Sequence, residues 1–236
     1  LFRRLVRAVE QILDNVIEEL RVSDFAPIDY ELDFSRSGDL PPVQCEDGDV
    51  SVSLSGKVDR VDGYIKNGRL YLRVMDYKSG KKSFSLSDIW YGLNMQLIIY
   101  LYALQQESLA RYRARLTAEL NEIVPAGVLY VPVRDELPDA ARDTDEEGLR
   151  ILRDKALRRS GLLSDDMSLL EAMEHGLEGD GRFIPVSIKT GKGEDEPTLA
   201  AKSAVADLAK FGRLARYTQK KLLEMGQALR NGSIEA

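Results

Sequence analysis

Gly56-Lys57-Val58-Asp59-Arg60-Val61-Asp62, then Lys66-Asn67-Gly68, then Leu70-Tyr71-Leu72-Arg73-Val74-Met75-Asp76-Tyr77-Lys78 form a strand–turn–strand pattern around which the rest of the chain can be placed. Asn-Gly between two alternating apolar runs is the strongest short-range signal of a tight β-hairpin turn. We therefore predict antiparallel strands over 50–63 and 70–78. Asp59 is out of phase with the apolar positions Val52 and Leu54. A bend or bulge near Gly56 would restore the alternation, because glycine within a strand often marks one.

The second strand carries an ionic break in an apolar face. Side chains alternate along a strand, so Leu70, Leu72, Val74, Asp76 and Lys78 share one face. Charges at core positions reduce stability unless they are paired or bind a metal, and such violations are where function is expected. A strand end with an exposed ion pair explains the same residues equally well.

Asp59 on the first strand favours the functional interpretation. Antiparallel pairing brings it within reach of Asp76, and a divalent cation relieves the repulsion between two close carboxylates. Mg²⁺ held by two carboxylates and a backbone carbonyl can activate water for phosphodiester hydrolysis, and Lys78 can stabilise the anionic transition state. Lys81 and Lys82 could meet phosphates, or could belong to an ordinary basic loop.

The remaining periodicity predicts a mixed α/β chain. We expect helices over 1–21, 86–106, from there to about 122, and 199–230, and two short helices between 149 and 176. We expect strands over 28–34 and 127–133, a strand or extended segment over 183–189, and loops over 35–49 and 134–148. The fold class is an α/β, restriction-endonuclease-like core with a central mixed β-sheet flanked by helices. We predict a single domain over 1–236, with a helical N-terminal segment (1–24), a catalytic core (about 25–135) and a helical C-terminal part (about 140–236).

Composition narrows the class of protein. Apolar residues make up 44% and charged residues 31% of the 236 residues, which favours a folded core over disorder. The longest apolar runs are too short for a membrane span. The single cysteine, Cys45, excludes an internal disulfide and a cysteine-rich metal site, and the single histidine excludes a multi-histidine zinc site. The net charge of −6 predicts weak DNA binding. The chain lacks an initiator Met and a signal peptide, so we expect a fragment of a longer, cytoplasmic protein.

Together these motifs resemble the PD-(D/E)xK nucleases of the RecB type. The resemblance rests on Gly56-x-Val58-Asp59-Arg60-x-Asp62, on Asp76-Tyr77-Lys78-Ser79-Gly80, and on Tyr91-Gly92-Leu93-x-x-Gln96-x-x-x-Tyr100. Phe25-x-Pro27-x-x-x-Glu31-x-x-Phe34 resembles the segment that carries an additional acidic residue. Within the family the chain most resembles AddB, the second nuclease-bearing component of bacterial AddAB helicase–nucleases.

The resemblance implies a role for each matching residue. Asp59 and Asp76 would bind Mg²⁺ (or Mn²⁺) together with the Tyr77 carbonyl, Lys78 would be the catalytic lysine, and Glu31 an auxiliary ligand or base. Gln96 would help to position the DNA or the site, and Tyr100 would contact DNA or be structural. Surface roles are the better interpretation of Arg60 and Asp62. Full-length relatives carry a 4Fe-4S cluster, whose cysteines are absent from this chain.

The predicted function is hydrolysis of one DNA strand during processing of double-strand breaks for recombinational repair. The expected partners are single-stranded DNA ends and an AddA-type helicase subunit, in the bacterial cytoplasm and away from membranes. Two alternatives stay open from the sequence. One is a catalytically silent nuclease-fold module for DNA binding or assembly, and the other is a phage or CRISPR-associated exonuclease of the same type.

Overall fold

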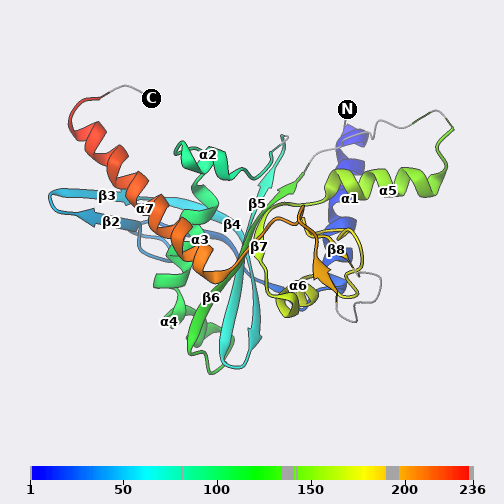
Figure 1. Cartoon of the computed structure of the whole chain (residues 1–236), viewed down its shortest axis with the longest axis horizontal. Coiled ribbons are helices and arrows are strands. Elements are labelled where there is room, and N and C mark those ends of the chain that lie inside the picture. Colours follow the sequence, from blue (N-terminus) through cyan, green and yellow to red (C-terminus); the bar gives the residue numbers. More distant parts are fainter. Residues whose placement is uncertain (1, 81, 134–140, 142, 190–196, 234–236) are drawn as a thin grey trace. The chain divides into compact units, whose positions relative to one another are not determined.

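The computed structural model describes residues 2–80, 82–133, 141, 143–189 and 197–233 (Figure 1). They form two compact units. Unit 1 comprises Leu1–Ala26, Asp76–Phe84 and Leu129–Val205, and unit 2 comprises Pro27–Met75, Ser85–Val128 and Ala206–Ala236. Six strands hydrogen-bond in the order β1-β4-β5-β6-β7-β10. This mixed α/β architecture confirms the predicted fold class.

Unit 2 contains the hairpin. Strands β4 (Gly56–Lys66) and β5 (Arg69–Lys78) pair antiparallel from Lys66↔Arg69 to Arg60↔Met75. Asn67 and Gly68 have φ of 53° and 72°, the left-handed pair that a two-residue type I′ turn requires. Strand β1 (Ala26–Phe34) lies beside β4, and β6 (Glu122–Pro132) beside β5. The Asn121 amide donates to the Gly68 carbonyl at 2.7 Å, so β5 and β6 start together and run parallel.

A separate two-stranded ribbon corrects two predictions. Strand β3 (Val50–Leu54) pairs with β2 (Val43–Asp47), whereas β4 pairs with β5. The predicted strand over 50–63 is therefore two strands interrupted at Ser55, and their alternation is independent, which explains the phase of Asp59. The predicted loop over 35–49 contains β2, whose buried Val43 and Cys45 alternate with exposed polar residues.

Four helices complete unit 2: α2 (Leu86–Trp90), α3 (Gln96–Glu107), α4 (Leu109–Leu116) and α7 (Leu208–Arg230). The predicted helix over 86–106 is broken, because Gly92 (φ 81°) and Asn94 (φ 54°) leave the helical conformation. Helix α7 begins at Leu208 rather than 199, since the Asp207 carboxylate caps it by accepting from the Lys210 amide at 2.6 Å. Helix α7 lies along the β2–β3 ribbon (Figure 1).

Unit 1 contains α1 (Phe2–Arg21), α5 (Glu146–Leu157), α6 (Met167–Met173), β7 (Ser160–Ser164) and the short strands β8 (Ile188–Lys189), β9 (Thr198–Leu199) and β10 (Val205–Ala206), which ends in unit 2. The two short helices and the N-terminal helix are as predicted, but β7 between the short helices was missed. Of the strand or extended segment predicted over 183–189, only Ile188–Lys189 form a strand, β8, and the strand predicted over 127–133 begins at Glu122. Part of the predicted loop over 134–148 lies outside the described residues, and α5 already begins at Glu146.

Buried polar groups hold unit 1 together. Arg159 pairs with Glu19 of α1 at 2.7 Å, both side chains being almost fully buried. The Glu174 carboxylate accepts the backbone amides of Arg182, Phe183 and Ile184 at 2.6–3.1 Å. These bonds satisfy the backbone of an irregular segment that has little secondary structure of its own.

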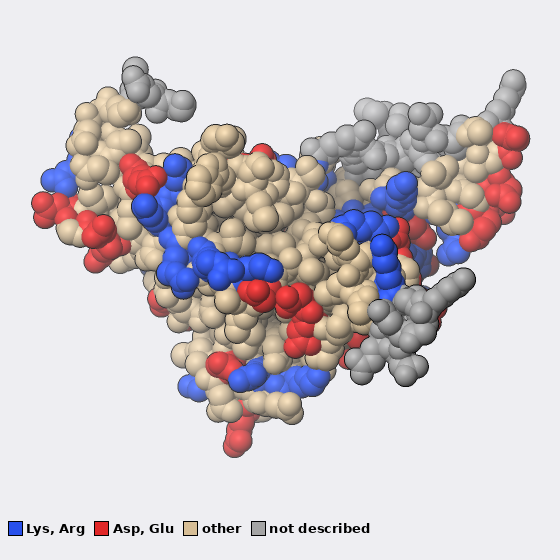
Figure 2. Space-filling model, viewed as in Figure 1, with Lys and Arg blue, Asp and Glu red and all other residues tan. Residues whose placement is uncertain are grey.

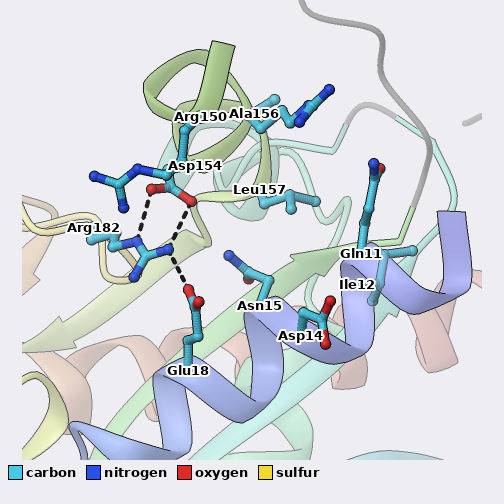
Figure 3. Close-up of a pocket in the computed structure, with 11 residues that line it drawn as sticks. Gln11, Ile12, Asp14, Asn15, Glu18, Arg150, Asp154, Ala156, Leu157 and Arg182 are labelled. Carbon is cyan, nitrogen blue, oxygen red and sulfur yellow. Dashed lines mark hydrogen bonds and ion pairs between the residues drawn. The ribbon is translucent and has the colours of Figure 1, made fainter. Parts of the chain in front are cut away.

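A pocket of 250 Å³ in unit 1 is lined mainly by α1 and α5 (Figure 3). Arg182 points into the space between the two helices, where it pairs with Asp154 and Glu18. None of the residues that the motifs single out lines this pocket. The Arg182 guanidinium in this pocket is neutralised by the Asp154 and Glu18 carboxylates. These ion pairs connect α1 and α5, so we assign the pocket a structural role.

Candidate functional site

The predicted site residues divide between the two units. Asp76, Tyr77, Lys78 and Lys82 belong to unit 1, and Glu31, Asp59, Gln96 and Tyr100 to unit 2. Lys81 lies outside the described residues.

Strand β5 ends in a carboxylate–ammonium pair. The Lys78 Nζ lies 2.5 Å from Asp76 Oδ2, and alternation along the strand puts both side chains on one face. The Asp76 side chain is 6% exposed and that of Lys78 33%, so the carboxylate is buried while the amine reaches towards solvent. The Asp76 side chain is therefore less exposed than in an ordinary surface ion pair. The Val133 amide donates to the Lys78 carbonyl at 3.0 Å, which ties the end of β5 to the end of β6.

Two lysines lie near one aromatic ring. The Lys78 and Lys82 ammonium groups are 6.0 and 5.9 Å from the centroid of the Tyr130 ring in β6. A cation within about 6 Å of a ring face is attracted by the ring quadrupole. The Tyr130 ring therefore lies close to both lysine ammonium groups.

Strand β4 presents Asp59 on a defined face. Val61 is the cross-strand partner of Val74, and cross-strand partners share a face of the sheet. Asp59 lies two residues before Val61, so alternation puts it on the Val61 face. By the same rule Asp76, two residues after Val74, lies on the same face of β5 as Val74. Asp59 itself is half-buried.

The opposite face of the hairpin corrects the surface roles predicted for Arg60 and Asp62. Both side chains are buried, at 1% and 0% exposure, as is Arg73. Arg60 donates to the two Asp62 carboxylate oxygens at 2.6 and 2.7 Å, and Arg73 Nε donates at 2.9 Å. Asp62 and Arg73 are cross-strand partners, so the register itself brings them together. Charged residues can be buried here because they neutralise one another.

Helix α3 begins with Gln96, whose Nε2 donates to the Tyr100 hydroxyl at 3.2 Å. Tyr100 is buried and stacks on Phe34 of β1, with 5.7 Å between centroids and 5° between planes. A Cβ at Gly56 would lie 2.2 Å from the Tyr100 hydroxyl, so only glycine lets β4 approach so closely. These contacts give Tyr100 a packing role that orients Gln96, and its DNA contact stays a prediction.

Glu31 adopts an unusual backbone conformation within β1. Its φ is 50°, and the side chains of Tyr30 and Glu31 are both exposed although they are consecutive. This break in alternation is what a β-bulge produces, and bulges redirect side chains next to active sites. The preceding Asp29 is buried and paired with Arg111 at 3.1 Å, which anchors the bulge from the other side of the strand.

The charge pattern was visible in the sequence, but two features were not recognised. The left-handed conformation of Glu31 has no sequence signal, because the residue is not Gly, Asn or Asp. The burial of Arg60, Asp62 and Arg73 could have been suspected from their alternation with valines on paired strands. Among the described residues no cluster of three or more Asp, Glu, His or Cys side chains could hold a metal ion.

The sequence model of the PD-(D/E)XK nuclease superfamily matches residues 1–236. The chain belongs to this superfamily. It is 34% identical over 232 residues to the B subunit of the ATP-dependent helicase/deoxyribonuclease of Ruminiclostridium cellulolyticum and, equally, to that of Acetivibrio thermocellus. Each alignment covers 98% of this chain and 19% of the relative. The corresponding protein of Clostridium botulinum (strain Hall) is 35% identical over 240 residues, covering 99% of this chain and 20% of the relative.

The chain thus spans about a fifth of the length of the curated relatives it matches. The family inferred from the motifs is confirmed, and the described helices include none long and apolar enough to cross a membrane.

Proposed function

We propose that this chain is a metal-dependent DNA nuclease domain that hydrolyses the phosphodiester bonds of one strand at a double-strand break. The observation that carries the proposal is the Asp76–Lys78 pair at the end of β5, in a chain of the nuclease superfamily. A buried carboxylate and a half-buried ammonium group two residues apart are suited to metal binding and to phosphate chemistry, respectively.

The proposed metal site consists of Asp59, Asp76 and the Tyr77 carbonyl, with Glu31 as an auxiliary ligand. Support comes from the register of β4 and β5, whose outermost pair in unit 2 is Arg60↔Met75. Asp59 directly precedes Arg60 and Asp76 directly follows Met75 in the sequence. Continuation of the same pairing by one residue would make the two aspartates cross-strand partners on the Val61–Val74 face.

The donor set fits Mg²⁺ or Mn²⁺. All the donors are oxygens, which hard divalent cations prefer. Mg²⁺ commonly uses one or two carboxylates and keeps several waters, so two aspartates and a carbonyl are enough. The bound metal would supply Lewis acidity and a water of lowered pKa. Cys45, the one cysteine of the sequence, is buried in β2. One cysteine is too few to hold a four-cysteine iron–sulfur cluster within this chain.

The other residues act on the substrate or the attacking water. Lys78 donates hydrogen bonds to the scissile phosphate or orients the attacking water, and so stabilises the developing negative charge. Gln96, held by Tyr100 at the start of α3, positions the DNA or the site. Lys82, which shares the Tyr130 ring with Lys78, neutralises a neighbouring phosphate.

The relatives support a proposed biological setting, because they are named as subunits of an ATP-dependent helicase/deoxyribonuclease. A helicase that unwinds a duplex produces the single strands that a nuclease domain of this kind would cut. We infer that this chain works as an exonuclease beside a helicase subunit of the AddA type, on single-stranded ends that unwinding produces, in the bacterial cytoplasm.

Cleavage of 5′-labelled single-stranded DNA in Mg²⁺ tests the proposal. Asp76→Ala and Lys78→Ala should each lower the cleavage rate by at least about 100-fold, as loss of a preorganised charge does. Asp165→Ala and Lys155→Ala remove the same charge types at exposed positions of unit 1 and serve as matched controls. Calorimetric titration with Mn²⁺ should lose its signal in Asp59→Ala and in Asp76→Ala.

Two results would refute the nuclease assignment. One is intact DNA after incubation of the folded protein with either metal. The other is equal activity of the control and site variants. Metal binding without cleavage would instead favour a catalytically silent nuclease-fold module.

A further inference from the structure

An exposed aromatic stack joins α2 and α7 in unit 2. The rings of Trp90 and Tyr217 lie 5.3 Å apart with 6° between their planes. The Tyr217 hydroxyl donates to the Trp90 carbonyl at 2.6 Å, which fixes the stack at its backbone. Trp90 is nevertheless 63% exposed, and the adjacent Tyr91 is 75% exposed. Tyr217 covers one face of the indole, so solvent reaches the other face.

The backbone that follows Trp90 forms an ordered, hydrogen-bonded turn. Gly92 adopts φ 81°, and a Cβ at this position would lie 3.3 Å from Lys221 Cε of α7. The Leu93 amide donates to the Asp88 carbonyl at 2.8 Å, and the Asn94 side chain donates to the Asp88 carboxylate at 2.6 Å. A large aromatic surface exposed on an ordered turn has little entropy left to lose when a ligand stacks on it.

Helix α7, which supplies Tyr217, has a surplus of positive charge. Helix α7 carries six basic side chains and one acidic one, a net charge of +5 in a chain whose net charge is −6. Helical spacing puts Lys210, Arg213 and Lys221 on the same face as Tyr217, together with Glu224. Asp207 at the start of the helix pairs with Lys210 at 3.5 Å. Figure 2 shows Lys and Arg side chains gathered along the surface where α7 runs in Figure 1. This face therefore combines flat aromatic groups with cations.

We propose that the Trp90–Tyr217 stack and the basic face of α7 form a binding site for single-stranded DNA, in which a base stacks on Trp90 and the α7 cations contact the backbone phosphates. This combination is how proteins bind single strands without reading sequence, because every base has a π-face and every nucleotide a phosphate. The inference rests on the proposed function, since it names where the nuclease substrate is held outside the Asp76 site.

The cations favour a nucleic acid over an apolar protein surface as the occupant. A protein interface is depleted of lysine relative to the rest of the surface, whereas α7 contains three lysines, of which Lys210 and Lys221 lie on the face that carries Tyr217 and Lys220 lies next to it. Glu224, which pairs with Lys221 at 3.2 Å, is the helix's one carboxylate. The surplus of basic side chains is what a polyanion requires.

Trp90 is the only tryptophan of the chain, so its fluorescence reports directly on the site. We would titrate the protein in EDTA with oligo(dT) and with an abasic oligonucleotide of the same length and charge. The expected result is strong quenching by oligo(dT) and little quenching by the abasic strand. Anisotropy of labelled oligo(dT) should show Trp90→Ala weakening binding by about tenfold or more, the usual loss of a stacked base.

Three further variants separate the contributions. Trp90→Phe keeps a ring and should restore most of the affinity, and Tyr217→Phe keeps the stack while losing the hydroxyl. Arg213→Ala should reduce the salt dependence of log Kd by about 0.7, the value for one phosphate contact on a single strand. Ile151→Ala, at an exposed apolar position of unit 1, is the control and should bind like the original protein.

The proposal is overturned if oligo(dT) and the abasic strand quench Trp90 equally, or if folded Trp90→Ala binds oligo(dT) with unchanged Kd. Because these measurements are made in EDTA, they are independent of catalysis. Quenching without cleavage would refute the proposed function alone, and cleavage without base-dependent quenching would refute this inference alone.

Discussion

Replacement of Asp62 by alanine is the sharpest test of how the hairpin is stabilised. The Asp62 carboxylate is fully buried and accepts hydrogen bonds from the guanidinium groups of Arg60 and Arg73, which are 1% and 0% exposed. Asp62→Ala removes the negative charge on which both cations converge while β4 and β5 keep their backbone pairing. The buried cations would then lose the partner that offsets their desolvation.

The magnitude follows from burial. Removal of one partner of a buried ion pair destabilises a protein by about 3–5 kcal/mol. With a urea m-value of about 2 kcal/mol/M, the unfolding midpoint should fall by roughly 2 M. Asp62→Asn keeps an acceptor oxygen but loses the charge. Its unfolding midpoint should lie between those of the original protein and Asp62→Ala.

The matched control is Glu122→Ala. Glu122 pairs with Arg69 on the same sheet, but the two side chains are 49% and 56% exposed. An exposed pair contributes at most about 1 kcal/mol, so this midpoint should fall by less than about 0.5 M. Urea unfolding followed by far-UV circular dichroism measures all four proteins. Equal midpoint losses in Asp62→Ala and Glu122→Ala would show that burial of the cluster does not determine its contribution.

Two further predictions concern Tyr112 and Glu31. Burial, reinforced by the Asp29 carboxylate, raises the pKa of Tyr112 above its usual value, so its contribution to stability is complete below about pH 10 and is lost as the pH rises towards the folded-state pKa. The free energy of unfolding, measured by urea titration between pH 9 and 11, should fall more steeply with pH for the original protein than for Tyr112→Phe, by up to ~1.4 kcal/mol per pH unit. Parallel curves would contradict this. Glu31→Gly and Glu31→Ala should lose the same nuclease activity, but the glycine variant should be about 1 kcal/mol more stable than the alanine variant, since only glycine relieves the φ of 50°. Thermal melts and cleavage rates measure both, and equal stability would argue against strain at this bulge.

Local sequence determined the hairpin and the family. The Asn67-Gly68 turn fixes the register of β4 and β5. Side-chain alternation then assigns Asp59 to the Val61 face of β4 and Asp76 to the Val74 face of β5. The N-terminal helix α1 was predicted to within a residue or two. These features depend on neighbours in the sequence, so the sequence alone contains them.

Contacts between distant segments were beyond such reasoning. Strand β2 was missed because a loop-like composition surrounds two buried positions, and only pairing with β3 and packing against α7 make it a strand. The break between α2 and α3 falls at Gly92, where an added Cβ would lie 3.3 Å from Lys221 Cε, 129 positions later in the chain.

Residue order was therefore sufficient to place this chain in the PD-(D/E)XK nuclease superfamily and to propose which carboxylates and lysine its chemistry would use, because those residues stand at fixed spacings on one hairpin. The folded chain was needed to establish that Arg60 and Asp62 are buried rather than exposed, and that Trp90 stacks on Tyr217. Burial of a charge and pairing of two rings depend on what lies opposite in space, and periodicity along one strand or helix carries no information about that partner.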